Sequence, residues 1–100
     1  MPLKTLGIPM GLSSWQELNR RCWQFSRDAI AETGADALVI PYPAASWLEL
    51  NRRCASFSSS VLEAVSGAGD APRVPNQLSD WQELNRRMAG LSRYLLEQIP

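Results

Sequence analysis

Three pairs of consecutive arginines are the residues best suited to recognition chemistry, because each pair belongs to the same motif, Trp-x-Glu-Leu-Asn-Arg-Arg. Arginine and tryptophan are the residue types found most often at binding hot spots. On a helix that begins at the Trp, both arginines lie on the side away from the apolar residues, where core packing does not require them. The predicted partner-binding residues are Trp15, Arg20, Arg21, Trp47, Arg52, Arg53, Trp81, Arg86 and Arg87.

Catalysis finds no support among the remaining residues. The 100 residues contain no histidine, which is the usual general base and metal ligand. Cys22 and Cys54 occupy the same repeat position, where the third copy has Met88, and this favours free, buried thiols that act as small hydrophobic side chains. The sequence Gly67-Ala68-Gly69 lacks the rest of a phosphate-binding loop. We therefore expect no enzymatic activity, no catalytic residue, no cofactor and no metal site.

The motif marks an internal repeat. The three Trp residues are spaced by 32 and 34 positions, and a β-branched residue and a proline precede each Trp by seven and six positions. The connecting segments therefore belong to the repeated unit. The sequence predicts one unit, residues 1–100, made of three repeats at about 8–39, 40–73 and 74–100.

Each repeat predicts one amphipathic helix. Ser14, Ser46 or Asp80 is suited to cap the helix start, and a Glu three residues later completes a capping box. Gly34 and Gly67 stand where the first two helices should stop, and the third runs on to Ile99. The expected fold class is all-α, packed as a small three-helix bundle or a helical repeat, with helices at about 14–33, 46–66 and 80–99.

The Pro/Gly-rich linkers of about 12 residues are longer than an antiparallel bundle needs. An extended segment of that length could run back along a helix and start the next helix parallel to it. Both the antiparallel and the parallel arrangement remain open from the sequence.

Polar residues occur inside the predicted apolar arc at two repeat positions, four and eleven residues after the Trp. Buried polar groups need hydrogen-bond partners. We expect these side chains to bond between helices and to fix their register, as a buried Asn does in coiled coils. They are Asn19, Asn51, Asn85, Ser26, Ser58 and Ser92. Trp23, by contrast, is replaced by alanine in the other copies, which indicates a local packing feature.

The first two copies have diverged unevenly. From the residue before the Trp to the seventh after it they match at eight of nine positions, but over the next eleven they match at two. A recent duplication would keep the whole unit alike, so the motif itself is constrained. The arginines have an alternative role in solubility and in pairing with the Glu of their own motif. The Trp residues could equally form the outer end of the core.

Composition restricts the kind of partner. Ten basic residues balance ten acidic ones, so neither nucleic acid nor an anionic membrane is favoured. The longest apolar run, Ala37 to Pro43, is too short for a transmembrane segment, and no secretory signal is evident. We expect a cytoplasmic protein, and the thin core of so short a chain leaves a homo-oligomer open.

Two functional hypotheses follow. The first is a multivalent binding or scaffold protein that presents three copies of the motif helix to a partner protein or assembly. The second is a coat whose neutral amphipathic helices lie on a hydrophobic storage granule. The segment Pro43-Ala-Ala-Ser-Trp-Leu-Glu-Leu-Asn-Arg-Arg-Cys-Ala-Ser-Phe-Ser58 resembles the helical units of phasins, the coat proteins of bacterial polyhydroxyalkanoate granules. That resemblance implies granule association and self-association without catalytic residues.

Overall fold

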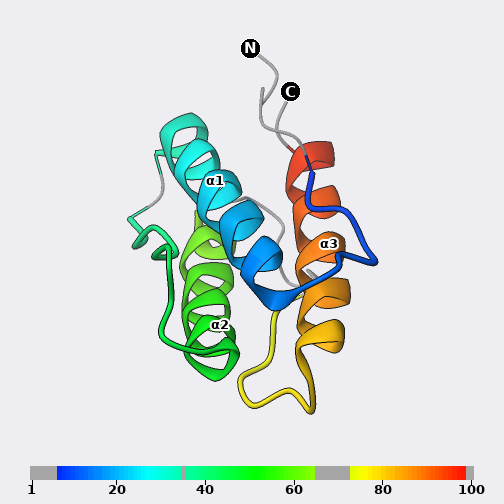
Figure 1. Ribbon diagram of the computed structural model, residues 1–100. Helices are drawn as coiled ribbons and strands as arrows, with labels where there is room; N and C mark the ends of the chain where they lie inside the picture. The colour runs from blue at the N-terminus through cyan, green and yellow to red at the C-terminus, as the bar shows by residue number, and fades with distance from the viewer. Residues whose placement is uncertain (1–6, 35, 65–72, 99–100) are drawn as a thin grey trace.

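The protein folds as a bundle of three helices that all pack against one another. The computed structural model describes residues 7–34, 36–64 and 73–98, and this part of the chain contains no strand. The all-α three-helix prediction is confirmed. The helices are α1 (Trp15–Thr33), α2 (Trp47–Glu63) and α3 (Trp81–Gln98), shown in Figure 1.

The helix starts agree with the sequence prediction. The hydroxyls of Ser14 and Ser46 and the carboxylate of Asp80 each accept a hydrogen bond from the backbone N–H three residues later, at 3.2, 3.2 and 2.7 Å. These bonds satisfy one of the free N–H groups at each helix start.

The helix ends agree in part. Gly34 ends α1 with φ of 70°, the left-handed conformation expected there, and its N–H donates to the carbonyl of Ile30. The second helix ends at Glu63, three residues earlier than predicted, and Ala64 beside it is right-handed. The predicted stop residues Gly67 and Ile99 lie outside the described residues.

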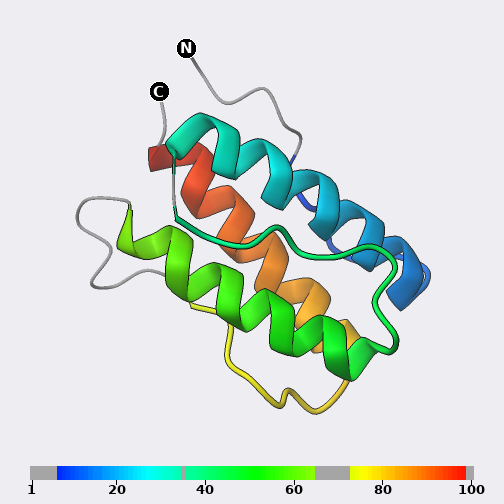
Figure 2. The ribbon, with the colours of Figure 1, turned by 90° about the vertical axis from the view of Figure 1, so that its left-hand side faces the viewer.

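All three helices point in the same direction, as Figures 1 and 2 show, so the parallel arrangement that the sequence left open is the observed one. The connecting segments make this possible because each returns along a helix before the next helix begins. We call residues 8–12, 40–44 and 74–78 straps 1, 2 and 3. Strap 2 lies on α1 and strap 3 lies on α2, whereas strap 1, which precedes α1, lies on α3.

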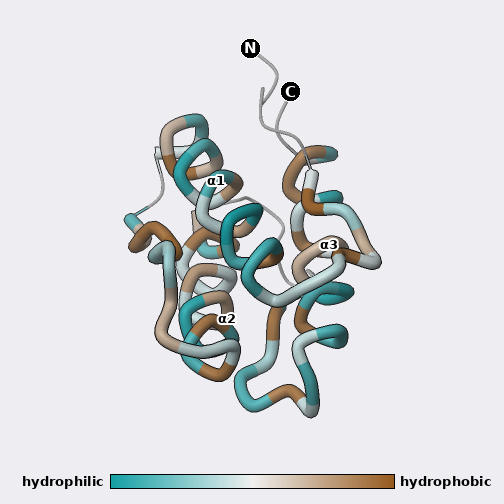
Figure 3. Tube along the Cα trace, viewed as in Figure 1, coloured by the Kyte–Doolittle hydropathy of each residue, from teal (hydrophilic) through white to brown (hydrophobic). Residues whose placement is uncertain are grey.

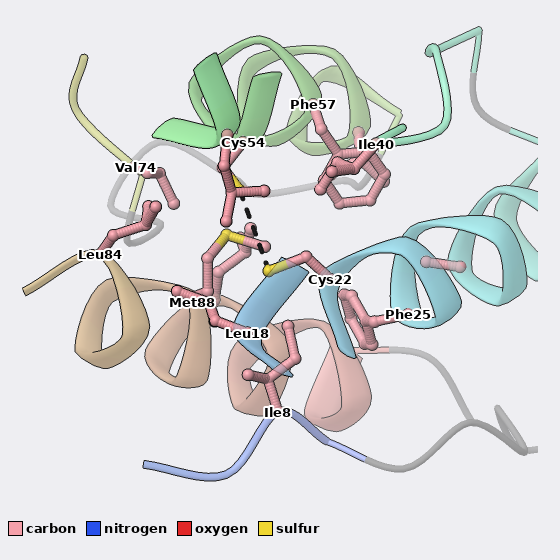
Figure 4. Packing of buried hydrophobic residues seen from close by; sticks show 14 of the residues in the cluster. Ile8, Leu18, Cys22, Phe25, Ile40, Cys54, Phe57, Val74, Leu84 and Met88 are labelled. Atoms are coloured by element: carbon pink, nitrogen blue, oxygen red, sulfur yellow. Dashed lines mark hydrogen bonds between the residues drawn. The ribbon is translucent and has the colours of Figure 1, made fainter. Parts of the chain in front are cut away.

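The core lies between the three helices and is closed by the first residue of each strap. Along every helix, hydrophobic and hydrophilic positions alternate with the helical period (Figure 3). The strap residues Ile8, Ile40 and Val74 are buried with the helix side chains (Figure 4). The largest buried helix side chains are Phe25, Phe57, Leu18, Leu50, Leu62, Leu84, Met88, Leu91 and Leu95.

Three sulfur-bearing side chains meet at the centre of this core. The thiols of Cys22 and Cys54 are free and buried, with 3.9 Å between their sulfur atoms, and Met88 lies beside them (Figure 4). Burial, with a smaller effect of the Cys22 thiol, raises the pKa of Cys54. Cys54 is therefore a protonated, weakly reactive thiol at neutral pH, as expected for a packing residue.

Candidate functional site

The three copies of the motif lie at the same end of the bundle, because the helices are parallel and each motif begins its helix (Figure 1). We call this the motif end. Its three tryptophans are half-buried, and Trp15 and Trp81 pack against the hydrophobic core. The rings of Trp15 and Trp81 therefore contribute to the outer layer of the core, and all three tryptophans present part of their surface to solvent.

Within each motif, one glutamate binds both arginines. The Glu17 carboxylate accepts hydrogen bonds from Arg20 at 2.8 Å and from Arg21 at 3.0 Å. Glu83 binds Arg86 at 2.6 Å and Arg87 at 2.8 Å, and Glu49 binds its two arginines in the same way. Only one half of the predicted capping box is therefore formed, the bond accepted by the cap residue. The glutamate carboxylate binds the two arginines instead.

The arginine hydrogen bonds lower the pKa of each motif glutamate. The larger contribution comes from the arginine three residues on and the smaller from the next one. Because the pKa is lower in the folded chain, these pairs add stability above the unfolded pKa of about 4.5, and that stability is lost as the pH falls through the folded value.

Replacing Glu17, Glu49 and Glu83 together with glutamine is therefore expected to flatten the acid limb of the stability profile. Urea midpoints measured between pH 6 and pH 3 should fall less steeply for this variant than for the wild type. Glutamine at Glu32 and Glu97, which form no such triad, serves as the control and should leave the slope nearly unchanged. An unchanged slope in the triple variant would show that the triads carry none of the acid sensitivity.

Charge is distributed unevenly along the bundle. Six arginines and four carboxylates, those of Asp80 and the three motif glutamates, lie at the motif end. The opposite end has no basic residue in the last turn of any helix, and Glu32, Glu63 and Glu97 lie there. Parallel helices also align their dipoles, with the positive ends together at the motif end. The motif end is therefore the positive pole of a chain that is neutral overall.

A surface hollow lies beside the motif end. It has a volume of about 480 Å³, and Leu48, Arg52 and Asn76 are among the residues that line it, between the start of α2 and strap 3. Leu48 is 60% exposed, and the other two copies have glutamine in its place. This part of the motif end combines an exposed apolar side chain with an arginine.

The conserved asparagine of each motif is buried and bridges two backbone groups of a strap. The Asn19 side-chain amide donates to the Pro41 carbonyl at 2.8 Å and accepts from the Ala44 N–H at 2.7 Å. Asn51 and Asn85 make the same pair of bonds to straps 3 and 1, at 2.7 to 3.0 Å. The amide of Asn supplies both the donor and the acceptor that this pair of bonds needs, whereas an ionised Asp only accepts.

The buried serines hold the other end of each strap. Ser26 accepts from the Ile40 N–H at 3.0 Å, and Ser58 and Ser92 accept from Val74 and Ile8 at 3.2 and 3.0 Å. Each hydroxyl also donates to the carbonyl three residues earlier in its own helix. Among the described residues no buried side-chain polar atom lacks a partner.

These bonds correct the sequence-based expectation for the six Asn and Ser residues. Their partners outside their own helix are the backbone groups of the straps and not groups of another helix. The sequence did contain a signal for this, since the Ile-Pro or Val-Pro pair recurs before every motif. A proline suits the position because it offers a carbonyl to the asparagine and has no N–H to satisfy.

The fold and its polar contacts define a parallel three-helix repeat bundle whose repeats are fastened by helix-to-strap hydrogen bonds. Comparison with protein-family models, with curated proteins and with solved structures returned no match to this chain. The described residues hold no group of three or more His, Cys, Asp or Glu side chains arranged to bind a metal ion. Within the same ranges no helix combines the length and apolar composition of a bilayer crossing.

Proposed function

We propose that this protein is a non-catalytic scaffold that binds a partner protein through the motif end of the bundle. The observation that carries the proposal is the parallel arrangement, which places all three Trp-x-Glu-Leu-Asn-Arg-Arg motifs around one end. Three similar contacts on one rigid body act together on a partner, because the first contact raises the effective concentration of the others.

Charge selects the kind of partner surface. The arginines outnumber the carboxylates at the motif end, and three helix dipoles add to the positive potential there. The glutamates at the opposite ends lie near the negative poles of the helix dipoles, where a negative charge destabilises a helix. Helix stability therefore does not account for the uneven distribution of charge along the bundle. We therefore propose an acidic protein surface as the partner, with the half-buried tryptophans and Leu48 providing apolar contact area.

The granule-coat hypothesis requires the apolar helix faces to be available to a hydrophobic surface. In this structure those faces are turned toward one another and are buried in the core. A coat function would therefore require the bundle to open, whereas the scaffold function uses the surface that the folded bundle presents. This contrast supports the scaffold as the better proposal.

The experiment compares two variants that each lose two positive charges. Arg52→Gln with Arg86→Gln removes two of the most exposed arginines of the motif end, 62% and 60% exposed. Arg27→Gln with Arg73→Gln removes two arginines outside the motifs. The tagged wild type and both variants, checked to be equally helical, are immobilised and exposed to source-cell lysate. The retained proteins are quantified by mass spectrometry.

We expect one lysate protein to be retained both by the wild type and by the variant at Arg27 and Arg73. The same protein should be several-fold depleted with the variant at Arg52 and Arg86. Its retention should weaken as salt rises, because exposed charges are screened. Equal retention by all three proteins, or retention only of granule material, would overturn the proposal.

A further inference from the structure

A second hollow lies on the flank of the bundle, between strap 1 and the second half of α3. Its volume is about 510 Å³, within the range of about 300–1,000 Å³ that is typical of ligand sites. Pro9 and Met10 line it from the strap, and Ala89, Arg93 and Leu96 line it from α3. None of these residues belongs to the motif, so the site is independent of the function proposed above.

Comparison of the three repeats shows which side chain is absent from this hollow. Straps 1 and 2 make the same hydrogen bonds to their helices, so Met10 corresponds to Tyr42, and residues 89 and 93 of α3 correspond to residues 23 and 27 of α1. At the α1 site the Trp23 ring stacks on Tyr42, with 5.8 Å between the ring centroids. The Arg27 guanidinium carbon lies 4.8 Å from the centroid of the Trp23 ring. The α1 site is thus filled by an aromatic ring that contacts both a strap side chain and an arginine.

The α3 site has similar surroundings but no ring between them. Arg93 is retained, Met10 replaces the tyrosine, and Ala89 replaces the tryptophan. Guanidinium and thioether groups both interact favourably with aromatic rings. The α2 site has lost more, because Ser59 and Asn76 stand where the arginine and the strap side chain would be. Only the α3 site combines an alanine in place of the ring with both an arginine and a strap side chain that can contact a ring.

We infer that the hollow between strap 1 and α3 binds an aromatic side chain presented by a partner protein. The ring enters above Ala89 and lies against Arg93 and Met10, as Trp23 lies against Arg27 and Tyr42. Leu96 provides a further apolar contact in the hollow. This gives the molecule a recognition site on its flank in addition to the motif end.

The test uses the full chain and two small probes, N-acetyl-L-tryptophanamide and N-acetyl-L-leucinamide, followed by ¹H–¹⁵N NMR. The tryptophan probe is expected to shift the amides of Met10, Ala89 and Arg93 saturably, with a dissociation constant of about 1 mM or tighter for a ligand of this size. The leucine probe should bind several-fold more weakly. Arg93→Gln should weaken the tryptophan probe several-fold and leave the leucine probe unchanged.

A substitution that supplies the missing ring completes the test. Ala89→Trp is expected to abolish binding of the tryptophan probe and to raise the thermal midpoint, since the new ring occupies the hollow. Ala55→Trp, the matched change on α2, should leave probe binding intact. Equal binding of both probes, shifts without saturation, or undiminished binding to folded Ala89→Trp would each overturn the inference. If Ala89→Trp does not fold, the Arg93→Gln comparison decides it alone.

Discussion

Replacing Asn51 with alanine is expected to lower the free energy of unfolding by about 2–4 kcal/mol. The substitution removes the two bonds that Asn51 makes to strap 3, to the carbonyl of Pro75 and to the N–H of Leu78. A fully buried backbone group left without a partner costs about 1–3 kcal/mol, and the two groups here are part-buried, so the loss for each lies toward the lower end of that cost. Strap 3 connects α2 to α3 in the chain, so its loosening weakens the packing of both helices. The measurement is equilibrium urea unfolding followed by circular dichroism.

Asn76→Ala is the matched control for this prediction. Asn76 lies on strap 3 itself, is exposed, and its side chain accepts a hydrogen bond from the next residue, Gln77. Removing the Asn76 side chain should change the free energy of unfolding by no more than about 0.5 kcal/mol. Asn51→Asp is a second informative variant, because aspartate is nearly the same size but, when ionised, cannot donate to Pro75. If Asn51→Ala and Asn76→Ala were equally stable, the strap bonds would not contribute to folding.

Replacing Phe57 with alanine should cost about 3–5 kcal/mol, the range typical of buried aromatic truncations. Phe57 is 1% exposed and packs edge to face with Phe25, with ring centroids 6.4 Å apart and planes at 80°. Small domains have a total stability of about 5–15 kcal/mol, so this single change removes a large share of it. Calorimetric or urea unfolding measures the loss directly.

Phe57→Leu provides the graded comparison, because the third repeat has Leu91 at the same position. This smaller change should cost less than half as much as Phe57→Ala, since leucine fills most of the space. A double-mutant cycle with Phe25→Leu should report a coupling of about 0.5–1.5 kcal/mol for the ring pair. Equal losses for the alanine and leucine variants would show that the ring contact, and not the filled volume, dominates at this position.

The helices were predictable because their signals are local. Cap residues, the spacing of apolar positions and Gly34 each act within a few residues, and the helix starts followed from them directly. The end of α2 was less predictable. Residues 64 to 66 continue the apolar pattern, so nothing local marks Glu63 as the last helical residue.

Helix direction and the partners of the buried Asn and Ser residues were not predictable from local patterns. The helix direction and the hydrogen-bond partners both depend on the helix on which each strap lies. Contacts between residues far apart in the chain, such as Ile8 and Ser92, decide this position. The asparagine was correctly predicted to be buried and bonded. Its partner was not predictable, because a strap backbone group comes within reach of the asparagine only once the strap has folded back onto the helix.

The three straps make similar contacts but are tethered differently, and this has a consequence for how the fold opens. Straps 2 and 3 each lie on the helix that precedes them in the chain, with 14 and 16 positions between the bonded residues, so a detached strap stays close to its binding site. Strap 1 lies on α3, the last of the three helices, although in the chain it precedes α1.

Re-forming the contact between strap 1 and α3 joins residues 84 positions apart, against 14 and 16 for the other two straps, and a longer loop costs more conformational entropy to close. The same bonds consequently protect this joint less against local unfolding. The contact between strap 1 and α3 is therefore the place where the bundle begins to open, although all three straps make similar contacts.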